Sequence, residues 1–225
     1  MTVTTRMNQL FRPAPLTAVL VGIVAAVWFL SASYLDLTLF SSQKSVLLLK
    51  VGAVDGATLS HGEIWRLVTS QFLHVHFLHM LFNLFGIYVL ANSIEHHAGT
   101  LALGSTYFVG GTVGQYFSVS FHPDLVSSGA SQALMALCGF VLAGSRRLRF
   151  SRFVVIGALV ISGIQAVLDI AVSASIKSGH GFGFAAGVLI GLGAIVFLNK
   201  WSKPKNSIRL VAPSTPLRGA DKPKR

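Results

Sequence analysis

A serine stands near the start of an apolar stretch of this chain. The stretch reads SSGASQALMALCGF from Ser127 to Phe140, and its only polar residues after Ser128 are Ser131 and Gln132. A serine becomes a nucleophile when a neighbouring base removes its hydroxyl proton, and an imidazole is such a base. His180 opens a second apolar stretch, HGFGFAAGVLIG. These residue types predict nucleophilic catalysis, provided that the fold brings them together.

Two further polar residues could support the same chemistry. His79 and Asn83 lie four residues apart in the segment HVHFLHMLFN, so they share one face of a helix. Both side chains can donate hydrogen bonds, as the stabilisation of a developing oxyanion requires. We expect His74, in the same segment, to line the cavity and hold water.

The composition indicates the kind of fold that must position these residues. The chain has 225 residues, of which 52% are hydrophobic and 11% charged. A soluble domain carries about twice that fraction of charge. Several apolar runs approach the ~20 residues that a membrane-spanning helix needs. We therefore predict an all-α polytopic membrane protein, a six-transmembrane-helix bundle. Its single cysteine, Cys138, forms no internal disulfide.

The apolar runs divide the chain into a membrane domain, 16–199, and two flanking segments. The predicted spans are 16–35, 74–95, 100–120, 129–145, 152–174 and 180–199. Between the first two lies a long mixed segment with many turn residues, which we predict to be a structured outer loop. The first span resembles a signal peptide in its flanks, but its length favours an uncleaved helix. Residues 1–15 are an N-terminal segment, and 200–225 read as a basic disordered tail.

The net charge of +11 is distributed in a way that indicates orientation. Two basic residues precede the first span, four lie from Arg146 to Arg152 where the fifth span begins, and eight follow the sixth. Basic segments beside membrane helices stay on the cytoplasmic side and contact lipid headgroups. We expect both termini in the cytoplasm of a multi-pass plasma-membrane protein, lipids as partners, and no nucleic-acid binding.

This topology converts sequence position into depth. Ser131, His180, His79 and Asn83 all fall within a layer about 5–15 Å below the outer face, taking 1.5 Å per residue. Polar side chains at that depth are costly unless they pair or face water, so their convergence indicates a site. Small residues would let the fourth and sixth spans approach closely; they are Gly129, Ala130, Ala133 and Ala136 on the fourth and Gly183, Gly187 and Gly191 on the sixth.

These motifs, in this order, resemble the rhomboid intramembrane serine proteases, over about residues 63–191. The loop GEIWRLVTSQFLH contains a WR pair, Trp65 and Arg66; HMLFN matches H-x-x-x-N; and the stretch ending EHHAG matches E-x-x-x-G at Glu95. GAS carries the nucleophile motif, and HGFGFAAG matches H-x-x-G-x-x-x-G. One departure is Gln132, where the family usually has the second glycine of G-x-S-G. This amide could widen the gap between two helices, alter the oxyanion pocket, or point into the cavity.

The resemblance implies an activity and roles for the residues. Ser131 and His180 would form a catalytic dyad, with His79 and Asn83 at the oxyanion. The substrates would be single-span membrane proteins cut near the outer face, without cofactor or metal, in a bacterial plasma membrane. We expect Trp65 and Arg66 to anchor the first loop at the interface. Glu95, near the inner surface, is expected to accept structural hydrogen bonds. For Asp169 we favour an interhelical hydrogen bond or a polar lining over a third catalytic member.

The sequence also suggests three other functions. The histidines of HVHFLH suggest a metal site, but a zinc protease would need a glutamate within H-E-x-x-H, which this segment lacks. A chelator would test that reading. A catalytically inactive rhomboid-like protein that binds membrane-protein clients is the main alternative, and Gln132 is the feature that favours it. A transporter is third, since inverted repeats are not evident.

Overall fold

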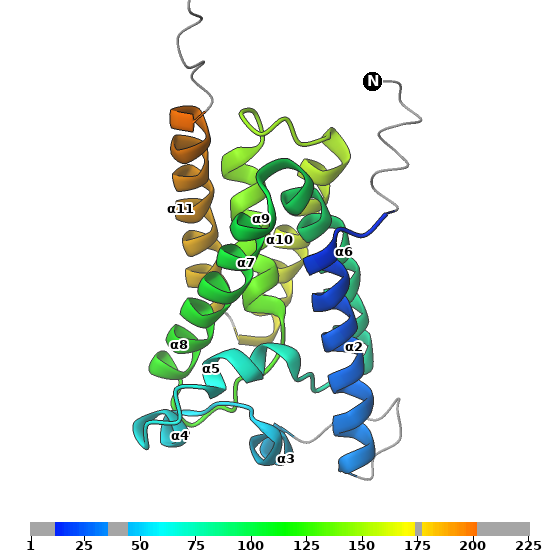
Figure 1. Ribbon diagram of the computed structural model, residues 1–225. Coiled ribbons are helices and arrows are strands. Elements are labelled where there is room, and N and C mark those ends of the chain that lie inside the picture. The colour runs from blue at the N-terminus through cyan, green and yellow to red at the C-terminus, as the bar shows by residue number, and fades with distance from the viewer. Residues whose placement is uncertain (1–11, 36–44, 174–176, 202–225) are drawn as a thin grey trace, which may run out of the picture.

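The computed structural model describes residues 12–35, 45–173 and 177–201, which fold as a bundle of helices (Figure 1). The longer elements are α2 (Pro15–Tyr34), α6 (Phe77–Ala98), α7 (Thr100–Gly104), η3 (Ser105–Gly110), α8 (Gly111–Phe121), α9 (Ser131–Gly144), α10 (Arg152–Ser173) and α11 (Ser178–Trp201). Figure 1 shows the start of α2 and the end of α11 at the same end of the bundle. The predicted all-α polytopic fold is confirmed. The predictions for residues 1–11, for 36–44 of the first loop and for the tail from 202 concern residues outside those described.

Each of the six predicted spans is helical, with bounds that differ by a few residues. Among the described residues, four helices are long and apolar enough to cross a membrane: α2, α6, α10 and α11. The third span is one uninterrupted helix from Thr100 to Phe121, whose middle, η3, is π-helical. The second helix starts at Phe77 instead of the predicted residue 74, because the backbone at His76 is still extended. The fourth, α9, has only 14 residues.

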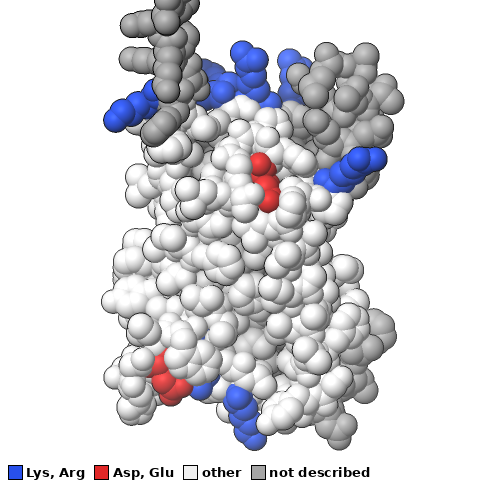
Figure 2. Space-filling view, viewed as in Figure 1, with Lys and Arg blue, Asp and Glu red and all other residues white. Residues whose placement is uncertain are grey.

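Charged side chains collect at the two ends of the bundle. Figure 2 shows Lys and Arg at both ends of this face, with almost none on the band between them. The band is apolar because the outer helices expose large hydrophobic side chains, among them Leu30 on α2, Leu159 on α10 and Leu189 on α11. Such a belt matches the hydrocarbon layer of a membrane. The chain is therefore an integral, multi-pass membrane protein.

Helix α9 lies at the centre of the bundle. Its residues from Ser131 to Val141 are all buried, and α6, α8, α10 and α11 all pack against it. A helix that is apolar on every side is stable only where other elements surround it. Its length of 14 residues corresponds to about 21 Å, which is too short to cross the hydrocarbon core fully. The start of α9 lies inside the protein, where Ser131 is almost fully buried.

The closest helix pair is α9 with α11, and its glycines make that approach possible. A Cβ atom on Gly187 would overlap the carbonyl oxygen of Ala136, and one on Gly183 would lie 2.5 Å from that of Gln132. Helices that pack with backbones this close need glycine at the contact. The predicted contact between the small residues of the fourth and sixth spans is confirmed.

Gly187→Ala is expected to destabilise the protein by about 1–3 kcal/mol, because the methyl group must push α11 away from α9. The measurement is thermal unfolding of the purified protein in detergent. Gly193→Ala is the matched control on the same helix, since a Cβ there meets no atom within 4 Å. Equal unfolding midpoints for the two variants would contradict the packing described.

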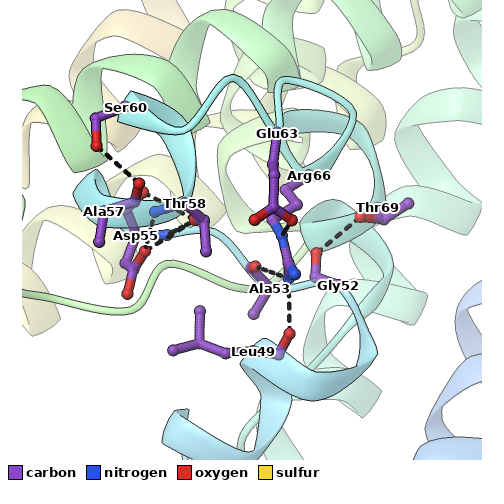
Figure 3. A network of polar contacts seen from close by, with 10 residues as sticks. All are labelled: Leu49, Gly52, Ala53, Asp55, Ala57, Thr58, Ser60, Glu63, Arg66 and Thr69. Carbon is purple, nitrogen blue, oxygen red and sulfur yellow. Dashed lines mark hydrogen bonds and ion pairs between the residues drawn. The ribbon is translucent and has the colours of Figure 1, made fainter.

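The predicted structured loop is present over residues 45–72, at the end of the bundle opposite the start of α2 and the end of α11 (Figure 1). It contains α3 (Ser45–Leu48), η1 (Leu49–Val51), α4 (Gly56–Ser60), α5 (Arg66–Thr69) and η2 (Ser70–Phe72). Arg66 ties these turns together (Figure 3): its Nε donates to Glu63 at 2.7 Å, and one terminal nitrogen donates to the carbonyls of Leu49 and Ala53 at 2.6 and 2.9 Å. Trp65 beside it is 51% exposed, as suits an interfacial aromatic residue.

At the opposite end of the bundle, Glu95 near the end of α6 connects this helix to α2 and α7. Its carboxylate accepts hydrogen bonds from the backbone N–H groups of Leu16 and Thr17, at 3.0 and 2.9 Å, and from the hydroxyls of Thr17 and Thr100. The first two satisfy N–H groups that the start of α2 would otherwise leave unpaired. Glu95 is therefore a structural acceptor, as expected, and it takes no part in the site described next.

Candidate active site

The serine and the histidine singled out from the sequence are in contact. Oγ of Ser131 lies 2.9 Å from Nε2 of His180, and both residues are almost fully buried. Ser131 is the first residue of α9, and His180 lies in the first turn of α11. The close packing of these two helices brings the side chains together. A hydroxyl at this distance can pass its proton to the imidazole.

The turn before Ser131 is held by backbone and side-chain contacts. Gly129 has φ +125°, a left-handed conformation that glycine adopts readily. Its N–H donates to the carbonyl of Ser70 at 2.9 Å, which ties the turn to the outer loop. The next N–H, of Ala130, donates to Nε2 of His74 at 3.3 Å. The serine is therefore presented from a fixed backbone.

His74 is a structural residue and not part of a cavity wall. It is fully buried. Its Nδ1 lies 3.3 Å from the Phe72 carbonyl, and its Nε2 receives the N–H groups of Ala130 and Asn83. All the ring's hydrogen-bonding capacity faces protein groups, so the prediction that His74 lines the cavity and holds water is wrong. The reason is that α6 begins after it, so helical spacing does not describe its direction.

The two proposed oxyanion donors lie in different surroundings. His79 lines the cavity together with Ser131 and His180. Gly129 lets its ring come close, since a Cβ there would be 3.3 Å from His79 Cε1. Asn83 is fully buried and outside the cavity lining. Its Nδ2 donates to the His79 carbonyl at 3.0 Å and lies 3.3 Å from His74 Nε2, so Asn83 supports the histidines in this conformation.

A cavity of about 320 Å³ opens over the Ser131–His180 contact. It lies where α8 and α10 end and α9 and α11 begin. Its lining consists of His79, Ser118, His122, Leu125, Val126, Ser127, Ser128, Ser131, Gln132, Gln165, Lys177 and His180. A pocket of this size can hold part of an extended peptide, and its polar wall suits backbone amides and water.

Gln132 takes part in a polar network without separating the helices. Its side chain is 5% exposed, and its Oε1 lies 3.1 Å from Ser131 Oγ and 3.4 Å from Gln115 Nε2. Its Nε2 donates to Ser127 Oγ at 3.3 Å. The side chain points toward α8, into space left by Gly114 and Gly179. The gap between α9 and α11 is not widened, and the amide reaches the wall of the cavity.

One residue of this network, Gln115, was not singled out from the sequence. Gln115 on α8 donates to the Gly129 carbonyl at 3.1 Å and accepts from Ser127 Oγ at 2.6 Å. It therefore braces the turn before Ser131 from the side opposite His74. The sequence did hold a signal for it, since Gln115 is a polar residue within the predicted third span, and the structure buries it fully.

Asp169 lies on the far side of the histidine. Its Oδ2 is 2.7 Å from Nδ1 of His180, and both side chains are almost fully buried. The carboxylate also accepts hydrogen bonds from Gln165 Nε2 at 3.0 Å and from the backbone N–H of Lys177 at 3.1 Å. The expected interhelical hydrogen bond is therefore present, and its partner is the histidine of the site.

Comparisons with known proteins match this chain to one family. The model of the Rhomboid domain matches residues 61–197, more than half of the chain. The RHOMBOID-like protein 6, mitochondrial, of Arabidopsis thaliana is 33% identical over 105 residues, 46% of this chain and 34% of that protein. The Rhomboid protease GluP of Bacillus subtilis is 32% identical over 142 residues, 62% of this chain and 28% of that protein.

A third relative has a different description. The Inactive RHOMBOID-like protein 8 of Arabidopsis thaliana is 31% identical over 87 residues, 39% of this chain and 25% of that protein. The matches thus span between about a quarter and a third of the length of these relatives. Proteins described as proteases and as inactive are both similar to this chain.

Proposed function

Since this chain belongs to the rhomboid family, we propose that it is an intramembrane serine endopeptidase. The observation that carries the proposal is the 2.9 Å contact between Ser131 Oγ and His180 Nε2. This contact lies at a cavity of about 320 Å³ inside a membrane-spanning bundle. A buried serine that only joined two helices would have no need of an open space above its hydroxyl.

The proposed reaction begins with attack by Ser131 on the carbonyl carbon of a peptide bond. As Oγ forms its bond to carbon, its proton passes to His180 Nε2. The tetrahedral oxyanion is stabilised by the Ser131 backbone N–H, which is free of helix bonds at the start of α9, and by His79. Each such donor contributes about 3–4 kcal/mol to catalysis.

The second half of the reaction reverses the proton transfer. The imidazolium of His180 gives its proton to the departing amine, and the C–N bond breaks to leave an ester on Ser131. Water enters from the polar cavity, loses a proton to His180 and attacks the ester carbon. Release of the acid returns the proton to Ser131 Oγ.

Substrates are proposed to be single-span membrane proteins, cut near the outer face. A second cavity of about 380 Å³ lies between α6 and α10, and its apolar lining residues are Leu78, Phe82, Ile164 and Leu168. It shares His79, Gln165 and Lys177 with the cavity over the serine. A transmembrane segment that unwinds at its outer end could enter from the lipid through this space. In this proposal both termini face the cytoplasm of a bacterial plasma membrane.

A second candidate function is that of an inactive rhomboid-like protein that binds membrane-protein clients. The observation that favours it is the position of Gln132, whose Oε1 lies 3.1 Å from Ser131 Oγ. A hydroxyl has one proton, so donation to Gln132 competes with donation to His180. The Ser131–His180 contact itself favours the protease.

The two functions differ in what happens to a substrate. The purified protein is reconstituted into liposomes with a tagged single-span protein whose outer end carries small residues. The protease is expected to cut the reporter near its outer end, and to do so equally in the presence of a zinc chelator. Stable co-purification of an uncut reporter would favour the binding protein, and loss of cleavage with the chelator would favour a metal enzyme.

A further inference from the structure

The hydrogen bonds around His180 determine which ring nitrogen carries a proton. A carboxylate only accepts hydrogen bonds, so the 2.7 Å contact of Asp169 Oδ2 with Nδ1 requires the proton to be on Nδ1. Nε2 is then left with a lone pair, and this is the nitrogen 2.9 Å from Ser131 Oγ. The ring therefore faces the serine with an acceptor, as a general base requires.

The carboxylate is itself fixed. Gln165, one turn earlier on α10, donates to Oδ1, and the backbone N–H of Lys177 donates to Oδ2. With three donors on two oxygens and 1% exposure, Asp169 has little freedom to turn away from the ring. Hydrogen bonds such as those from Gln165 and Lys177 keep the carboxylate in place, and in this way proteins maintain the geometry of a reactive group.

Among the described residues around the ring, Asp169 is the anionic partner. His79 from α6, His122 from the segment after α8 and Lys177 before α11 line the same cavity as His180. These groups are neutral or positive. Among the described residues that line the two cavities, Asp169 is the single carboxylate. When His180 gains the serine proton, the new positive charge has Asp169 as its counter-charge.

From these contacts we infer that Asp169 is a positioning residue for His180: it fixes the ring's tautomer and orientation and stabilises the imidazolium that forms when Ser131 attacks. The inference rests on the proposed function and extends it, because the site then works with three side chains where the family resemblance implies two.

The test compares four full-length proteins: the wild type, Asp169→Asn, Asp169→Glu and Asp124→Asn. The rate of labelling by a fluorophosphonate is measured from about pH 4 to about pH 9, because histidines in proteins change charge within this range. Asp169→Asn is expected to lower the maximal rate by about 10²–10⁴-fold, because the amide can hold the ring in the wrong tautomer. Asp169→Glu, which keeps the carboxylate, is expected to recover part of that loss.

A purely structural role would not alter the pH profile. In Asp169→Asn the acid limb of the labelling rate is expected to move to lower pH, because the imidazolium has lost its counter-charge. Asp124→Asn makes the same chemical change at an exposed position outside both cavities, and it should leave the rate and the profile as in the wild type. Wild-type rates with an unmoved acid limb in Asp169→Asn would overturn the inference.

A second measurement does not depend on activity. Nitrogen NMR of histidine-labelled protein, assigned with His180→Gln, reports the tautomer of the ring at a pH where it is neutral. The expected result is a proton on Nδ1, and a proton on Nε2 would overturn the inference even in an inactive protein. If the wild type does not react with the fluorophosphonate but its His180 ring carries the proton on Nδ1, the proposed protease is refuted and the contact between Asp169 and His180 still stands.

Discussion

Ser131→Ala is expected to abolish cleavage of a single-span reporter in liposomes, with a loss of about 10⁴–10⁶-fold in rate. Oγ is the atom that forms the bond to the substrate carbon, and alanine has none. The change is small in volume, and α9 keeps its packing because its neighbours in the first turn are unchanged. Cleavage is followed by the appearance of the shortened reporter on a gel.

The matched control is Ser120→Ala, the same substitution at an exposed serine on α8. Ser120 lies outside the lining of both cavities, so the Ser120→Ala variant should cut the reporter at the wild-type rate. Equal cleavage by Ser131→Ala and Ser120→Ala would contradict the assignment of the nucleophile. Equal loss in both would indicate a general loss of fold, which thermal unfolding of the same samples would detect.

His180→Ala is expected to cause a loss of similar size, about 10⁴–10⁶-fold, together with a loss of stability. The activity falls because no base remains to take the serine proton. The stability falls because Asp169, 1% exposed, loses one of the two donors on its Oδ2. Removing one partner of a buried charged hydrogen bond costs about 1–3 kcal/mol or more.

A double variant separates these two effects. His180→Ala with Asp169→Asn removes the uncompensated carboxylate, while the amide oxygen can still accept from Gln165 or Lys177. The thermal midpoint is expected to rise relative to His180→Ala, and cleavage is expected to stay absent. A double variant no more stable than His180→Ala would show that the buried carboxylate is not the cause of the instability.

The sequence was sufficient for the fold and for the central contact of the site. The lengths of the apolar runs predict the spans, and the basic residues predict their directions. Together they convert residue number into depth, which places Ser131 and His180 in one layer. The small residues then select the pair of helices that touch, since only glycine permits the approach seen between Gly187 and Ala136.

The sequence was less informative where a side chain's direction is set by neighbours or by irregular backbone. His74 lies before the start of α6, so its inward orientation depends on the carbonyl of Phe72 and the N–H of Ala130. Helical spacing correctly puts Asn83 one turn from His79, yet it does not reveal that the amide bonds back to the His79 carbonyl.

Two interactions of the site depend on how separate helices pack against one another. Depth predicted that Asp169 is near the outer end of its span, but its contact with His180 Nδ1 requires the last turns of α10 to lie against the start of α11. Gln132 likewise finds its partners on α8 and in the segment before α9, and no pattern within α9 indicates them.

The most direct test of the central claim is the site of covalent labelling. The purified protein is treated with a fluorophosphonate, digested and analysed by mass spectrometry, with Ser131→Ala, His180→Ala and Gln132→Gly in parallel. The account predicts an adduct on Ser131 in the wild type and no adduct in the Ser131 and His180 variants. No adduct on Ser131 in the wild type would contradict an activated serine. An adduct that then appeared in Gln132→Gly would identify the Gln132 amide as the group that silences it.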